Sequence, residues 1–266
     1  MELQGRLGDI RRSGFGVAAI SYDPMRVTGD FSQRRGITFP LLSDARSTVI
    51  QRYGILNNTV SPTNHQLYGI PFPGTFVVDR DGIVTSRVFE TAYQERDTMS
   101  NLLIRLGGRV DAPATKISAP HLDLTTFSTD QIVAPGTHFS LVIDAVPGRR
   151  VHVYAPGVSG YKPIALVIQP QAGLLVQDVR VPRAEDYFFK PLNEHVAVYQ
   201  KPFRIVQDVT IDSSPQIEAA LRGVPTMTIR GTLDYQACDD KVCFLPQTTP
   251  LEWTINLIAL DRERVK

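Results

Sequence analysis

The sequence is poor in cysteine, with only Cys238 and Cys243 among its 266 residues. A run of about 18 apolar residues is also absent, so no membrane-spanning helix is predicted. The 28 Lys and Arg residues nearly balance the 27 Asp and Glu residues, which leaves a net charge of +1. Nucleic-acid-binding domains usually carry a strongly basic face. The composition therefore supports neither direct membrane insertion nor a nucleic-acid partner.

Motifs for metal binding and for hydrolysis are missing as well. The five histidines are scattered, and no His-x-x-x-His motif or second cysteine pair completes a four-ligand zinc site. We therefore predict no metal and no cofactor. A Gly-x-Ser-x-Gly elbow is absent and the carboxylates are dispersed, so glycoside or ester hydrolysis has no support. The cysteine pair is the remaining candidate for chemistry.

The two cysteines are close in sequence, with four residues between them. A fully extended chain would hold their Cα atoms roughly 16 Å apart, at about 3.3 Å per residue. A disulfide needs a separation of about 4.4–6.8 Å. The polar residues 239–241 must then turn the chain back, which suits their turn-forming side chains.

Three interpretations of the pair are open: a redox couple, a structural disulfide, and two buried reduced thiols. A closed loop of six residues would stabilise the fold by only about 2 kcal/mol. Structural disulfides matter most in small domains with too little core, and this segment is long enough to build its own. Reversible exchange is the interpretation that we favour, and the other two remain alternatives.

The length predicts two domains, and the first half alternates helix with strand. Apolar spacing and turn residues predict an α/β layer fold. The Asp-Gly pair at residues 81–82 is a strong hairpin signal. The expected elements are a helix over residues 3–10, a buried strand over 15–21, a helix near 30–35, an extended piece over 39–44, a helix over 45–53 capped by Asp44 or Ser43, strands over 75–78 and 83–88, and a helix over 97–106.

Four stretches together resemble the redoxin branch of the thioredoxin fold, which holds the alkyl hydroperoxide reductase/thiol-specific antioxidant (AhpC/TSA) proteins. They are residues 17–23, 39–44, 53–54 and 73–82. The resemblance covers residues 2–106 and implies a thioredoxin-like domain over residues 1–108. It also implies that Pro73 matches the cis-proline that faces the active cysteine in that family.

The chain departs from this family at its amino terminus. The redox-active cysteine of the family lies at a strand–helix junction before the first helix, whereas here no cysteine precedes Cys238. The strand that precedes that helix is central in the family, between the counterparts of residues 17–21 and 75–78. We therefore expect a truncated domain and an internal start at Met1. Residues 1–6 lack an apolar signal-peptide core, so a signal segment is expected to be absent from this chain.

The second half has the texture of an all-β domain, with apolar alternation and frequent Pro and Gly. We predict a linker over residues 109–118 and a β-sandwich over 119–262, with a short helix or turn at 215–222. The strand candidates are residues 121–125, 139–145, 151–154, 165–169, 174–181, 196–205, 209–211, 225–235 and 251–258.

The segments Gly231 to Cys238 and Cys243 to Pro246 resemble the periplasmic amino-terminal domain of DsbD-type thiol:disulfide interchange proteins. That resemblance covers about residues 117–260 and implies an immunoglobulin-like sandwich. It also implies that Cys238 and Cys243 shuttle electrons, in a periplasmic or exported bacterial setting. Tyr235 and Phe244 flank the pair and either shape and shield the site or serve as ordinary core aromatics.

Together the two resemblances predict a thiol-disulfide oxidoreductase of redoxin or peroxiredoxin type with a DsbD-like electron-relay domain. Its partners would be thiol or disulfide proteins, with a membrane electron donor as one candidate. The alternative is a non-catalytic docking module with a structural disulfide and an inactive redoxin half. Whether the chain is an enzyme, and whether peroxide or a protein disulfide is its substrate, stay open at this point.

Overall fold

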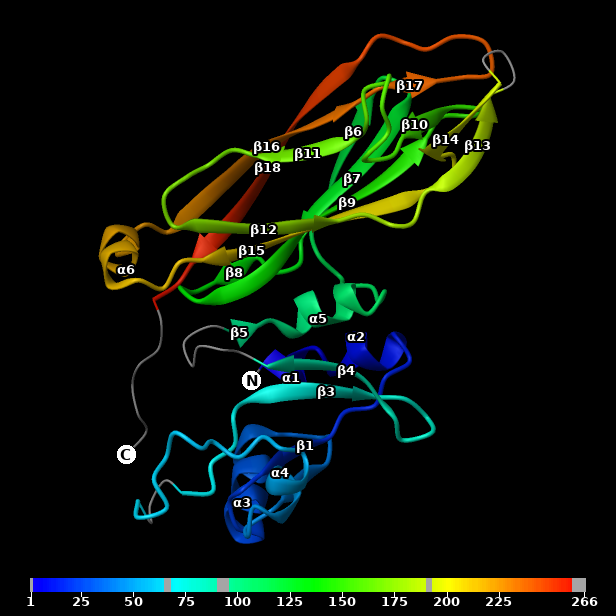
Figure 1. Ribbon diagram of the computed structural model, residues 1–266. Helices are drawn as coiled ribbons and strands as arrows, with labels where there is room; N and C mark the ends of the chain where they lie inside the picture. Colours follow the sequence, from blue (N-terminus) through cyan, green and yellow to red (C-terminus); the bar gives the residue numbers. More distant parts are fainter. Residues whose placement is uncertain (1, 65–67, 90–95, 190–192, 260–266) are drawn as a thin grey trace. The chain divides into compact units, whose positions relative to one another are not determined.

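The computed structural model describes residues 2–64, 68–89, 96–189 and 193–259 (Figure 1). The chain folds as two compact units, Met1–Arg109 and Val110–Lys266, and each is described by itself. Met1, predicted as an internal start, and residue 262, predicted as the end of the sandwich, lie outside the described residues. No helix among the described residues is both long and apolar enough to cross a bilayer.

The first unit is an α/β structure, which confirms the predicted class. Its two small sheets are the parallel pair β1–β2 and the antiparallel hairpin β3–β4. The elements are α1 (Glu2–Gly5), α2 (Leu7–Arg12), β1 (Ala19–Ser21), α3 (Met25–Arg35), β2 (Leu41–Ser43), α4 (Thr48–Arg52), β3 (Gly74–Val78), β4 (Val84–Phe89), β5 (Arg96–Asp97) and α5 (Met99–Arg105).

Local sequence signals explain several of these boundaries. The carboxylate of Asp44 accepts hydrogen bonds from the backbone N–H groups of Thr48 and Ile50, both at 2.9 Å, as a capping residue should. Gly82 adopts the positive φ of 81° that the turn between β3 and β4 requires. The hydroxyl of Thr98 accepts a hydrogen bond from the Asn101 N–H at 3.0 Å and begins α5. The predicted cap and hairpin are confirmed.

Three expectations for this unit are wrong in detail. The helix predicted over residues 3–10 is two short helices that meet at Arg6. The predicted buried strand over residues 15–21 is only the three-residue β1, and Ile20 stays 41 % exposed. The strand is not buried because, among the described residues, β1 pairs with β2 alone. The peptide bond before Pro73 is trans, the isomer that X–Pro bonds favour by about 0.5–1 kcal/mol.

The second unit is all-β apart from one short helix, as predicted. Its elements are β6 (Thr115–Ala119), β7 (Leu122–Ser128), β8 (Ile132–Val133), β9 (Thr137–Pro147), β10 (His152–Tyr154), β11 (Ala165–Ile168), β12 (Leu174–Arg180), β13 (Glu185–Phe189), β14 (Glu194–Tyr199), β15 (Phe203–Ile211), α6 (Pro215–Leu221), β16 (Thr226–Tyr235), β17 (Ala237–Cys238) and β18 (Gln247–Leu257).

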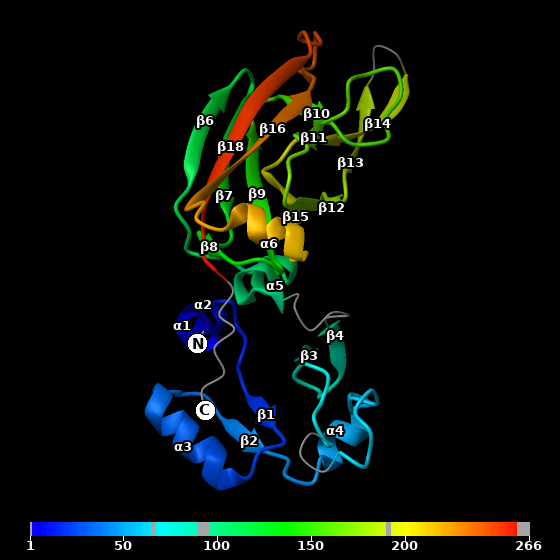
Figure 2. The same ribbon diagram turned by 90° about the vertical axis from the view of Figure 1, so that its left-hand side faces the viewer.

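Two sheets, with strand orders β12-β15-β9-β7-β6 and β11-β16-β18-β8, enclose the core of this unit (Figure 2). Inward-facing residues of both sheets, such as Phe139 and Ile143 from β9 and Ile229 from β16, are fully buried in one cluster. Alternation along the strands explains this, because every second side chain points to the same face. A third sheet, β13-β14-β10-β17, carries the cysteine hairpin at its edge.

Two predicted boundaries in this unit differ from the structure. Residues 115–118, expected within the linker, belong to β6, because Ile117 and Ala119 pack against the sandwich core. The single strand predicted over residues 196–205 is divided at Pro202 into β14 and β15. These strands belong to different sheets, so the chain changes sheet there.

Candidate functional site

The two cysteines form a disulfide at the end of a tight hairpin. Cys238 and Cys243 are bonded through their Sγ atoms, and their Cα atoms lie 4.0 Å apart. The N–H of Asp239 donates to the carbonyl of Val242 at 3.0 Å, and the N–H of Phe244 donates to the carbonyl of Ala237 at 2.9 Å. These backbone bonds hold the two cysteines opposite each other, alongside the bond between the sulfurs.

The side chain of Asp239 fixes the loop between the cysteines. Its carboxylate accepts hydrogen bonds from the backbone N–H groups of Lys241, at 2.7 Å, and Val242, at 2.8 Å. The bonds from Val242 and then Lys241 lower the pKa of Asp239, because they stabilise the charged form. The predicted turn is thus confirmed. Of its two carboxylates, that of Asp239 accepts hydrogen bonds from the backbone of the turn.

The two sulfur-bearing residues differ in exposure. Cys238 is 1 % exposed and belongs to a small buried cluster with Tyr154 and Val198. Cys243 lies on the exposed side of the hairpin. A second molecule can therefore reach the disulfide from the Cys243 side, while Cys238 stays covered.

Tyr154 contacts both sulfurs. Its hydroxyl lies 3.1 Å from the Sγ of Cys238 and 3.4 Å from the Sγ of Cys243. The β10–β17 pairing produces this contact: His152 lies opposite Cys238, and Tyr154 is the next residue on the same face. Burial raises the pKa of Tyr154, so the hydroxyl stays protonated at the sulfurs.

A second tyrosine extends this contact toward the surface. The Tyr161 ring stacks on Tyr154 with 4.1 Å between the ring centroids. The two hydroxyls act on each other's pKa: burial and then Tyr161 raise the pKa of Tyr154, whereas Glu194 raises that of Tyr161 and Tyr154 lowers it. The Tyr161 hydroxyl donates in turn to a carboxylate oxygen of Glu194. Glu194 begins β14, and Tyr161 lies in the loop between β10 and β11. The two stacked tyrosines therefore lie between the sulfurs and a carboxylate.

The opposite flank carries a histidine and a third tyrosine. His152 is 3 % exposed, and its ring lies 4.6 Å from that of Tyr187. Burial lowers the pKa of His152, although Asp240 and then Asp239 act in the opposite direction. The Tyr187 hydroxyl donates to the Asp240 carboxylate at 3.3 Å. Asp240 is thus engaged at the rim of the hairpin.

Tyr235 and Phe244, predicted to shape the site, lie at the base of the hairpin. Tyr235 is fully buried in the sandwich core, and its hydroxyl donates to the carbonyl of Pro120 at 2.7 Å. Phe244 stacks on His121, with 3.7 Å between ring centroids, and also packs against the core. Both rings anchor the hairpin to the sandwich.

Sequence reasoning missed the residues that surround the sulfurs: His152, Tyr154, Tyr161, Tyr187 and Glu194. The strand over residues 151–154 was predicted, but its pairing with the cysteine hairpin depends on contacts 84 residues apart in the chain. An aromatic residue at alternate positions of that strand was the one signal available.

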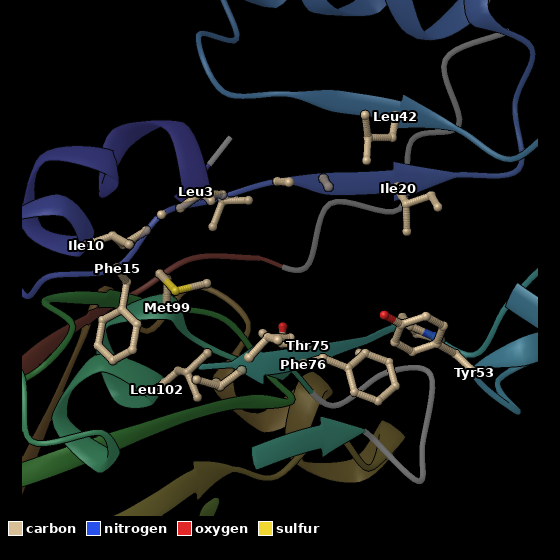
Figure 3. Close-up of a pocket in the computed structure, with 18 of the residues that line it drawn as sticks. Leu3, Ile10, Phe15, Ile20, Leu42, Tyr53, Thr75, Phe76, Met99 and Leu102 are labelled. Carbon is tan, nitrogen blue, oxygen red and sulfur yellow. The ribbon is translucent and has the colours of Figure 1, made fainter. Parts of the chain in front are cut away.

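Pro73 lies far from the cysteines in sequence, in a pocket of the first unit. This apolar pocket has a volume of about 1050 Å³ and runs between β1 and β3. Ile20 of β1 and Thr75 of β3 extend toward the space between the strands (Figure 3). No cysteine lies in this unit. Among the described residues, no group of three or more His, Cys, Asp or Glu side chains is placed to hold a metal.

Two family models match separate parts of the chain. Residues 1–87 match the model of the AhpC/TSA family. Residues 124–253 match the model of the amino-terminal region of thiol:disulfide interchange protein DsbD. The chain therefore contains one segment similar to the AhpC/TSA family and one similar to the amino-terminal region of DsbD. Both resemblances expected from the sequence are confirmed.

Curated relatives match the AhpC/TSA type. A putative peroxiredoxin of Mycobacterium tuberculosis is 35% identical over 85 residues, which cover 30% of this chain and 50% of the relative. Alkyl hydroperoxide reductase E of Mycobacterium bovis is 33% identical over 98 residues, which cover 36% of this chain and 59% of the relative. The chain thus spans about half the length of the curated relatives it matches.

Two solved structures align with part of the chain. The N-terminal periplasmic domain of ScsB from Proteus mirabilis gives a TM-score of 0.39 at 12% identity, over 53% of this chain and 51% of that chain. The reduced N-terminal domain of DsbD from Neisseria meningitidis gives 0.29 at 14% identity, over 44% of this chain and 81% of that chain.

Proposed function

We propose that this protein is a thiol-disulfide oxidoreductase that exchanges electrons with a partner protein through Cys238 and Cys243. The observation that carries this proposal is the asymmetry of the pair, one residue exposed and one covered beneath it. The two family matches agree with thiol-disulfide chemistry in general. The asymmetry supports separate roles for the two sulfurs.

Cys243 is the sulfur that meets the partner. A partner thiolate attacks its Sγ, the Cys238–Cys243 bond breaks, and Cys238 leaves as a thiolate. A second partner thiol then attacks the mixed disulfide, which leaves an oxidised partner and a dithiol on this protein. In the reverse direction Cys243 attacks a partner disulfide, and Cys238 resolves the intermediate.

Tyr235 and Phe244 act in this proposal as supports rather than as contacts to substrate. The Tyr235 hydroxyl and the stacked Phe244 ring fix the two ends of the hairpin on the sandwich. Fixed ends keep the sulfurs close when both are reduced, which favours closure of the disulfide. Pro73 lines the apolar pocket of the first unit, and the site-shaping role that we propose for it is confined to that pocket.

The partners that we propose are thiol or disulfide proteins, with a membrane electron donor as one candidate, in the periplasm or another exported location. Disulfides persist in such oxidising compartments and are rare in the reducing cytosol. The curated relatives are named for peroxide chemistry. Within these 266 residues both cysteines lie in the hairpin, so peroxide reduction by the redoxin-type segment would use a thiol from outside them.

A second candidate function is a docking module with an inert disulfide. The burial of Cys238 and the thiol-free apolar pocket of the first unit favour it. The reduction potential of the Cys238–Cys243 couple, measured against glutathione buffers, separates the two. An exchanging pair should lie above about −300 mV, whereas a structural bond should lie below that value. A result below it would reject the relay.

A further inference from the structure

We propose that Tyr154, Tyr161 and Glu194 form a proton path that deprotonates the buried thiol of Cys238 when it resolves a mixed disulfide. This inference rests on the proposed exchange function and deepens it. The need for such a path follows from burial: Cys238 is 1 % exposed, so water has little access to its sulfur. A thiol must lose its proton to become a nucleophile.

The path requires hydrogen bonds that point outward from the reduced sulfur of Cys238 to Glu194. The Tyr161 hydroxyl donates to Glu194, so its oxygen is left to accept from Tyr154. With its proton directed to Tyr161, the Tyr154 oxygen can accept from the Cys238 thiol, 3.1 Å away in the disulfide form. Each member then accepts from the inner neighbour and donates to the outer one, which is the order that proton transfer to a base requires.

The two tyrosines conduct the proton rather than store it. Burial raises the pKa of Tyr154, and the hydrogen bond to Glu194 raises that of Tyr161. A tyrosinate is therefore disfavoured at either position, so each hydroxyl passes one proton on as it receives another. Glu194, half-buried at the outer end, holds the proton and releases it to water.

Resolution of the mixed disulfide moves one proton and replaces one sulfur–sulfur bond with another. The S–H bond of Cys238 breaks, and an O–H bond forms on the Glu194 carboxylate. The Cys238 sulfur attacks the Sγ of Cys243, a new Cys238–Cys243 bond forms, and the bond from Cys243 to the partner sulfur breaks. The partner sulfur leaves with the electron pair of that bond and takes a proton from solvent. Over both steps, the attack by Cys243 and the resolution by Cys238, the partner disulfide is reduced by two electrons and this protein is oxidised by two.

Other titratable groups around Cys238 and Tyr154 are engaged elsewhere. Asp239 accepts from the backbone of the loop, and Asp240 accepts from Tyr187. Burial keeps His152 a weaker base than usual, and its ring lies edge-on to that of Tyr154. Lys241 is exposed on the loop. Glu194 is the carboxylate that bonds the tyrosine stacked on Tyr154, so we place the base of the path there.

The test follows reaction of the reduced protein with oxidised glutathione, with mass spectrometry of quenched samples. Cys243 first forms a glutathione adduct, and Cys238 then resolves it to the internal disulfide. Tyr161→Phe keeps the stacked ring without the hydroxyl, and Glu194→Gln keeps the shape without the base. Both should slow resolution at least tenfold at neutral pH, so that the adduct accumulates.

The pH profile separates a proton path from a packing effect. In both variants the resolving rate should rise about tenfold per pH unit, because hydroxide replaces the carboxylate; the wild-type rate should be nearly flat across neutral pH. Two controls leave the path intact: Tyr199→Phe, whose hydroxyl bonds the carbonyl of Pro182, and Glu185→Gln, whose carboxylate pairs with Lys201.

The outcomes are distinct. Wild-type rates and profiles in Tyr161→Phe and Glu194→Gln would overturn the proton path while leaving the exchange function intact. A wild-type protein that forms neither the adduct nor the internal disulfide would instead reject the exchange function itself. If both variants resolve the adduct slowly and with an altered pH profile, while the two controls resolve it at the wild-type rate, the result supports the proton path and the exchange function.

Discussion

His152 lies directly opposite Cys238 across the β10–β17 strand pair, and both residues are almost fully buried. The histidine therefore occupies a place where a charge is poorly solvated. That relationship makes the stability of the hairpin region dependent on pH.

Stability should fall as the pH drops below about 6.5, the ordinary pKa of histidine. Burial lowers the pKa of His152 in the folded protein, so the unfolded chain binds the proton first. The free energy of unfolding then decreases from pH 6.5 down to the lowered pKa and levels off with respect to this group below it. Urea unfolding at several pH values measures this, and His152→Gln should reduce the slope. An unchanged slope in the variant would contradict the assignment.

Removal of the Tyr154 hydroxyl should make the Cys238 thiol less acidic. A hydroxyl 3.1 Å from the sulfur can donate to a thiolate, and hydrogen bonds to charged groups contribute about 1.5–3 kcal/mol. In a Cys243→Ser background, Tyr154→Phe should raise the thiol pKa of Cys238 by about 1 unit or more. Thiolate absorbance at 240 nm, followed against pH, reports it. Equal pKa values in the two proteins would show that the contact does not act on the thiolate.

Loss of the Asp239 carboxylate should make the disulfide easier to reduce. Its two hydrogen bonds hold the loop in the shape that brings the sulfurs together, so Asp239→Ala lowers the tendency of the dithiol to close. Redox titration against glutathione should show a less negative potential. Asp240→Ala, which leaves those two bonds in place, is the matched control and should change the potential less. The reverse order would assign the loop geometry to Asp240.

Gly231→Ala should destabilise the second unit by about 1–3 kcal/mol. A Cβ atom at Gly231 would lie 2.7 Å from the backbone carbonyl oxygen of Val167, and backbone cannot move aside as a flexible side chain can. At Gly148 the nearest atom would be 3.5 Å away, an ordinary contact, so Gly148→Ala serves as the control. Thermal unfolding compares the two. Equal melting temperatures would contradict the close approach of β11 and β16.

Local signals made much of the fold predictable. The Asp-Gly turn at residues 81–82 and the alternating strands of the second half are encoded within a few residues, so their prediction succeeded. The prediction of a buried strand over residues 15–21 was wrong because burial depends on neighbouring elements that the local sequence does not specify. The cysteine pair could be predicted as a site because its two members are also close in sequence. Its hydroxyl and carboxylate neighbours come from loops and strands distant in sequence, so only the folded pairing reveals them.

Mixed-disulfide capture tests the central claim most directly. Cys238→Ser leaves the exposed thiol of Cys243 without its resolving partner, so this variant should retain a disulfide-linked partner on a non-reducing gel after mild oxidation. Cys243→Ser leaves only the covered Cys238 thiol and should retain much less. Capture by Cys238→Ser that is lost on reduction is the predicted result; no captured partner with either variant would contradict the account.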